Sequence, residues 1–139
     1  MDAIVQARTV RPTRTFLEKA FLLCEEFQKD KPRTLRITRH LYDLYKLAQT
    51  PFAKEAMEDV ELYHKIVQHR EAYYHIKNVD YSLLLPNAIS FVPPEKLIND
   101  YKSDYQMMLQ EYIYDDQAPS FEELLDFMSQ LQQQFRNIH

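Results

Sequence analysis

The 139-residue chain contains no glycine. Walker and Rossmann phosphate loops need glycine for tight turns and close backbone approach, so both motifs are excluded. Two-residue hairpins of the Asn-Gly type are excluded as well, which argues against an all-β fold. Hydrophobic residues make up 45% of the chain, enough for one core in a chain of this length. These features favour a single all-α domain.

Cysteine content and hydrophobic runs exclude further classes. Cys24 is the only cysteine, so an internal disulfide and a cysteine-based zinc cluster are excluded. We expect Cys24 to be a small core residue. The N-terminal residues lack the apolar core of a signal peptide, and no run approaches the ~20 apolar residues of a membrane span. We therefore expect a cytoplasmic protein with no membrane partner.

Charge is distributed unevenly along the chain. Residues 1–46 carry 10 Lys and Arg against 6 Asp and Glu, whereas residues 47–139 carry 7 against 15. The first third could therefore face phosphate groups, while the remainder is a poor candidate for broad nucleic-acid binding.

Hydrophobic periodicity predicts a bundle of about six helices. Thr15 with Glu18, and Ser120 with Glu123, fit the capping-box pattern at two helix starts, and Asp59 can cap a third. Residues 78–93 show no helical period, and we expect an irregular connection there with extended backbone at 83–85. The predicted helices cover 14–29, 34–48, 52–58, 60–77 and 94–114, and a last helix follows the capping box at Ser120 with its apolar face running from Leu124 to Phe135.

The N-terminal residues differ from the rest. Residues 3–10 have the pattern of a short strand, but no second convincing strand is present to pair with it. We expect residues 1–13 to be an extended strand remnant or arm, and residues 14–139 to form the helical bundle.

Polar residues gather on the predicted helix at 34–48. Arg36, Arg39 and Asp43 fall opposite its apolar stripe, and Arg39 and Asp43 are four residues apart, so their side chains can touch. On the preceding helix, Lys19 lies at the edge of the apolar face. The ordinary interpretation is a solvated ion pair worth under ~1 kcal/mol and a lysine that covers apolar surface. The alternative is a polar cluster directed at a ligand or a second domain.

Three blocks occur in an order typical of one protein family. They are RTFLEKAFLLCEEF at 14–27, RITRHLYDLYKL at 36–47 and DYQMMLQEYIYDDQAPSFEELL at 104–125. Together they resemble the C-terminal half of AbiEii/AbiGii-type nucleotidyltransferase toxins. The fold of that family is a small mixed α/β nucleotidyltransferase domain followed by a helical bundle. The resemblance implies that this chain corresponds mainly to the bundle.

The resemblance also implies roles for individual residues. Lys19 aligns with a lysine expected to contact nucleotide phosphates, with Arg36 and Arg39 as further phosphate-binding cations. Asp43 aligns with an aspartate expected to orient that lysine or assist the acceptor hydroxyl, so Lys19 and Asp43 form the expected catalytic pair. The family's Gly-Ser turn cannot exist in a chain without glycine, and no pair of metal-binding acids precedes Arg14. We therefore expect no metal site here and an inactive segment when it is alone.

In the complete protein, the resemblance implies magnesium and NTP as cofactors, neither bound tightly by this segment alone. The implied reaction transfers a nucleotide from NTP to an RNA acceptor such as tRNA. The implied partners are an N-terminal nucleotidyltransferase domain and a cognate antitoxin, in a bacterial toxin–antitoxin or abortive-infection system.

Two alternatives remain open at this point. Arg70 and His75 resemble the Arg and His of all-α RNases of the HEPN type, which face a phosphodiester, although this short pattern is common by chance. A non-catalytic bundle that only binds another protein is also compatible with the sequence.

Overall fold

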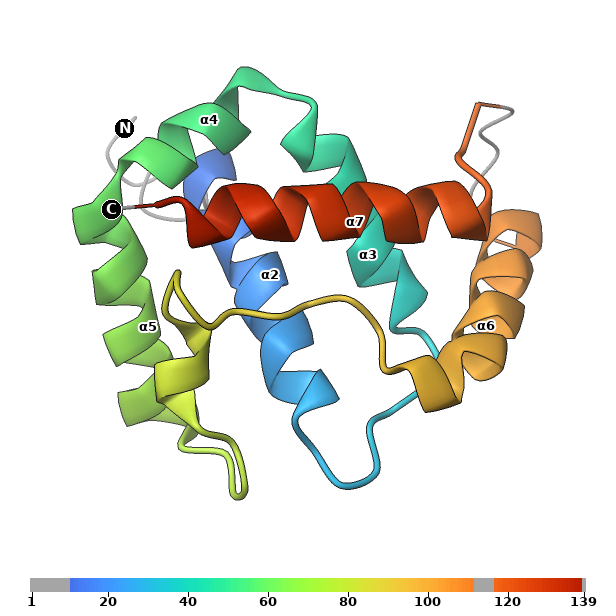
Figure 1. Ribbon diagram of the computed structural model, residues 1–139, viewed down its shortest axis with the longest axis horizontal. Helices are drawn as coiled ribbons and strands as arrows, with labels where there is room; N and C mark the ends of the chain where they lie inside the picture. Colours follow the sequence, from blue (N-terminus) through green and yellow to red (C-terminus); the bar gives the residue numbers. More distant parts are fainter. Residues whose placement is uncertain (1–10, 112–116, 139) are drawn as a thin grey trace, which may run out of the picture.

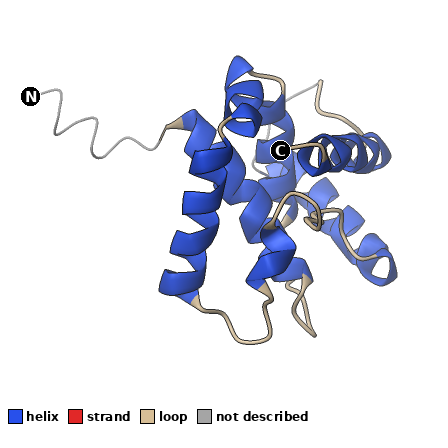
Figure 2. Cartoon of the chain, turned by 60° about the vertical axis from the view of Figure 1, so that its left-hand side comes forward, coloured by secondary structure: helices blue, strands red, loops and turns tan. Residues whose placement is uncertain are grey.

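The computed structural model describes residues 11–111 and 117–138, and this part of the chain is helical with no strand (Figure 2). The predicted all-α bundle of about six helices is confirmed. The predicted strand at 3–10 and the end of the predicted helix at 94–114 lie outside the described residues. The elements are α2 Pro12–Phe27, α3 Thr38–Ala48, α4 Pro51–Glu58, α5 Val60–Tyr74, the 3₁₀ helices η1 Tyr81–Leu84 and η2 Glu95–Leu97, α6 Ile98–Glu111 and α7 Phe121–Arg136.

Helix α2 packs against α3, α4, α5 and η1. Figure 1 shows it running behind α7, between α5 on one side and α3 on the other. Its buried side chains fall on more than one face, as expected of a helix enclosed by several others rather than lying on a surface. The apolar ones are Phe16, Leu17, Ala20, Phe21, Leu23 and Cys24.

An aromatic cluster joins α7 to the rest of the bundle. The Phe135 ring lies 5.6 Å from Phe16 on α2, 6.2 Å from Tyr63 on α5 and 5.2 Å from Phe91, centroid to centroid. Rings at these separations contribute beyond the area that they bury. The predicted capping box at the start of α7 is confirmed, with Ser120 and Glu123 bonded reciprocally.

The capping box predicted at Thr15 is wrong. Helix α2 begins at Pro12, with Arg11 at the N-cap and no side-chain cap. Proline suits the first helical position because its φ is already helical and its missing N–H would be unpaired there. Glu18 therefore lies inside the helix, where its carboxylate is free to pair with other side chains.

Helix α3, by contrast, starts later than predicted, at Thr38 rather than Thr34. Arg36 has a left-handed backbone with φ 64°, which costs a non-glycine residue about 1–3 kcal/mol. Buried Asp104 on α6 holds this turn, because its carboxylate accepts hydrogen bonds from Arg36 N at 2.7 Å, Thr38 N at 3.0 Å and Thr38 Oγ1 at 2.6 Å. A residue distant in sequence thus caps α3.

Two further local predictions differ from the structure. Helix α5 is capped by Asp59 as predicted, but it ends at Tyr74 because His75 adopts the left-handed conformation. The expected extended backbone at 83–85 is found only at Leu85, because residues up to Leu84 form η1, whose first turn is held by the Asp80 side chain. The Asp80 side chain accepts a hydrogen bond from Ser82 N and so favours a 3₁₀ turn over extended backbone.

Candidate functional site

Lys19 on α2 and Asp43 on α3 meet across the helix interface. The Lys19 ammonium lies 3.2 Å from Asp43 Oδ2, and it also lies 3.2 Å from His40 Nδ1. The Lys19 and Asp43 side chains are 25% and 33% exposed. The structure thus brings together the two residues predicted as a pair, and their cluster remains accessible to a ligand.

His40 was not among the predicted site residues. It lies three residues before Asp43, so helical spacing alone places both side chains on one face of α3. Burial lowers the pKa of His40, and the positive charges of Lys19, Arg33 and Arg39 lower it further, against an opposing effect of Asp43. The ring is therefore neutral at neutral pH, and its Nδ1 lone pair can accept a hydrogen bond from Lys19. An ammonium has three donors, so Lys19 keeps one N–H beyond these two contacts.

The lowered pKa of His40 predicts how stability varies with pH. The unfolded chain takes up a proton at the ordinary histidine pKa of about 6.5, whereas the folded chain resists protonation. Because the unfolded state binds more protons in this range, the free energy of unfolding should fall as the pH drops through about 6.5. Urea unfolding between about pH 5 and 8 should show a flatter profile for His40→Gln. A profile as steep as wild type would contradict this, and exposed His64→Gln is the control.

Arg36 and Arg39 lie at a different place from the Lys19 cluster. Both line a pocket of about 420 Å³ between the start of α3 and α6, with Leu35 and Met107 among the other lining residues. The predicted contact between Arg39 and Asp43 is not formed in the described structure, because the Asp43 carboxylate pairs with Lys19 instead. Arg39 acts on the cluster only through its charge, which contributes to the lowered pKa of His40.

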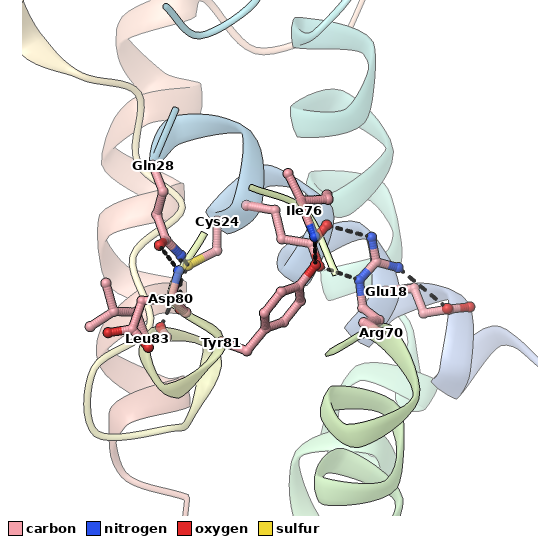
Figure 3. A network of polar contacts seen from close by, with 9 residues as sticks. Glu18, Cys24, Gln28, Arg70, Ile76, Asp80, Tyr81 and Leu83 are labelled. Atoms are coloured by element: carbon pink, nitrogen blue, oxygen red, sulfur yellow. Dashed lines mark hydrogen bonds and ion pairs between the residues drawn. The ribbon is translucent and has the colours of Figure 1, made fainter. Parts of the chain in front are cut away.

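Arg70, half of the pair in the RNase alternative, is buried between α5 and α2. Its Nε and Nη2 each lie 2.7 Å from a carboxylate oxygen of Glu25, and its Nη1 lies 3.4 Å from Glu18 (Figure 3). Burial alone would lower the pKa of Arg70, but hydrogen bonds and charge from Glu25, with the charge of Glu18, raise it. The guanidinium is therefore held against carboxylates, while His75 is exposed at the end of α5.

Metal-ligating side chains do not form a cluster in the part of the chain that the structure describes. No group of three or more His, Cys, Asp or Glu side chains within 11–111 and 117–138 is placed to hold a metal ion. Asp43 is a single carboxylate with one oxygen already paired to Lys19.

The described part of the chain is thus helical throughout, and the side chains of Lys19, Asp43 and His40 form a polar cluster between α2 and α3. Residues 2–127 match the family model described as nucleotidyl transferase AbiEii toxin, type IV TA system. The chain belongs to this toxin–antitoxin family, which confirms the resemblance found from the three sequence blocks and implies an antitoxin partner.

The chain has no match among curated proteins or solved structures, and its described helices are too short or too polar to span a membrane.

Proposed function

We propose that this chain is the C-terminal helical part of a nucleotidyltransferase that moves a nucleotide from NTP to an RNA acceptor such as tRNA. In this proposal Lys19 contacts phosphate, Asp43 holds Lys19 in position, and Arg36 and Arg39 bind phosphate groups from the separate pocket that they line. A separate nucleotidyltransferase region supplies the Gly-Ser turn and the acids that hold magnesium, and a cognate antitoxin controls the complete protein.

The contact between Lys19 and Asp43 carries this proposal. A partly exposed ion pair contributes at most about 1 kcal/mol to stability, so the bundle does not depend on it. Lysine is a suitable point charge for phosphate. The Asp43 carboxylate and the neutral His40 ring fix the direction of the ammonium while leaving it a donor for a ligand.

A fixed ammonium suits nucleotidyl transfer on physical grounds. Negative charge on the phosphate oxygens must be stabilised in the transition state, and cations that are already positioned do so without reorganisation. Neutral His40 avoids placing a second positive charge directly against Lys19, which would push the two side chains apart. Lys19, Asp43 and His40 therefore form a preorganised contact for phosphate, and the metal-binding region of the complete protein would complete the active site.

The proposal is tested by following labelled NTP into RNA. We expect no transfer when the chain is incubated with each labelled NTP, magnesium and total RNA. Transfer should occur when a separately expressed nucleotidyltransferase region of the same system is added. RNA cleavage by the chain alone, lost in His75→Ala, would instead favour the RNase alternative. The absence of both reactions under every condition would favour a protein-interaction bundle.

A further inference from the structure

A pocket of about 280 Å³ lies between α2 and α5. Lys19 belongs both to this pocket and to the cluster with Asp43 on α3. The pocket therefore connects the phosphate-handling cluster to the C-terminal end of α5. Its lining residues are Thr15, Glu18, Lys19, Leu22, Arg70 and Tyr74.

The Tyr74 ring is held in place at the rim of this pocket. The Arg70 guanidinium carbon lies 4.8 Å from the ring centroid, a cation–π distance, and Arg70 is itself fixed by Glu25 and Glu18. Tyr74 is nevertheless 53% exposed. The Arg70 guanidinium thus lies against the Tyr74 ring, and the ring keeps exposed surface that an aromatic ligand can contact.

Charge in the pocket is compatible with an anionic group at Lys19. Glu18 is the carboxylate that lines the pocket, and its oxygens already lie 3.4 Å from Arg14 Nε and 3.4 Å from Arg70 Nη1. Its negative charge is therefore balanced within the protein. Lys19 keeps one N–H donor beyond its contacts with Asp43 and His40, and this donor is available to a phosphate.

We propose that this pocket binds one nucleoside phosphate unit, with its base stacked on Tyr74 and its phosphate at Lys19. Unpaired bases are commonly recognised by stacking on aromatic side chains, and this contact tolerates any base. The inference rests on the proposed function, because it places a substrate beside the same lysine. The unit is either the NTP or an unpaired end of the RNA acceptor, which share this chemistry.

Neighbouring Tyr73 offers a matched control. It is more exposed than Tyr74, at 77%, and its ring lies against His69 with centroids 4.7 Å apart. It does not line the pocket. Both tyrosines therefore present an exposed ring near the end of α5, but of the two only Tyr74 lines the same pocket as Lys19.

The test measures equilibrium binding of the full chain to ATP and, separately, to a short unpaired RNA. For one of the two ligands, Tyr74→Leu should weaken binding roughly 10-fold or more, the effect expected when stacking on an aromatic is lost. Tyr74→Phe should bind nearly as well as wild type, because it keeps the ring. Tyr73→Leu should leave binding unchanged. The ligand that responds identifies whether donor or acceptor occupies the pocket.

A photoreactive base on the same ligands gives a second measurement on the wild-type chain, in case Tyr74→Leu fails to fold by circular dichroism. Crosslinks should fall on the peptide that contains Tyr74. Crosslinks elsewhere, no binding of either ligand, or an equal loss in Tyr73→Leu would overturn the inference. If binding depends on Tyr74 but no nucleotidyl transfer is found, the proposed function is rejected and the inference that the pocket binds a nucleoside phosphate stands.

Discussion

Arg70→Met should lower the free energy of unfolding by about 3–5 kcal/mol, the usual cost of removing one partner of a buried ion pair. The reason is that buried Glu25 would lose two hydrogen bonds of 2.7 Å and keep an uncompensated charge inside the bundle. Urea denaturation followed by far-ultraviolet circular dichroism measures this change.

Two further variants make the result specific. Glu25→Leu combined with Arg70→Met should recover most of the lost stability, because no buried charge then remains without a partner. Lys102→Ala breaks the exposed pair with Glu122 and should leave stability almost unchanged. A loss in Arg70→Met as small as that in Lys102→Ala would show that the buried pair does not hold the helices together.

Lys19→Ala should reduce nucleotidyl transfer by about 10²–10³-fold, the range found when a single preorganised transition-state contact is removed. Stability should change little, because the ion pair with Asp43 is partly exposed. The initial rate of label transfer to RNA measures the effect. Lys29→Ala is the matched control, since Lys29 also pairs with a carboxylate, Glu26, at 3.0 Å but lies outside the cluster. An equal loss in both variants would contradict a specific role for Lys19.

Much of the helical architecture follows from local sequence. Apolar residues at helical spacing predicted six helices, and the caps at Asp59 and Ser120 are local signals that the structure confirms. The start of α3 could not be found in this way. Its cap is Asp104, which lies 66 residues beyond Thr38 in the chain and reaches it only through tertiary packing.

Only part of the candidate site could be predicted. Resemblance to the family indicated Lys19 and Asp43, and in the bundle the Lys19 ammonium lies 3.2 Å from the Asp43 carboxylate. Helical spacing could have indicated His40, three residues from Asp43. By contrast, the RNase alternative placed Arg70 against a phosphodiester, because nothing local shows that its guanidinium pairs with Glu25, 45 residues earlier.

The central claim is that Lys19 and Asp43 act as one unit in handling phosphate. A double-mutant cycle on the initial rate of nucleotidyl transfer tests it most directly, using Lys19→Ala, Asp43→Ala and the combined variant in the complete protein. Because Asp43 is proposed to act through Lys19, the combined variant should be no more than about threefold slower than Lys19→Ala alone. Losses that multiply, or an Asp43→Ala enzyme as fast as wild type, would contradict the claim.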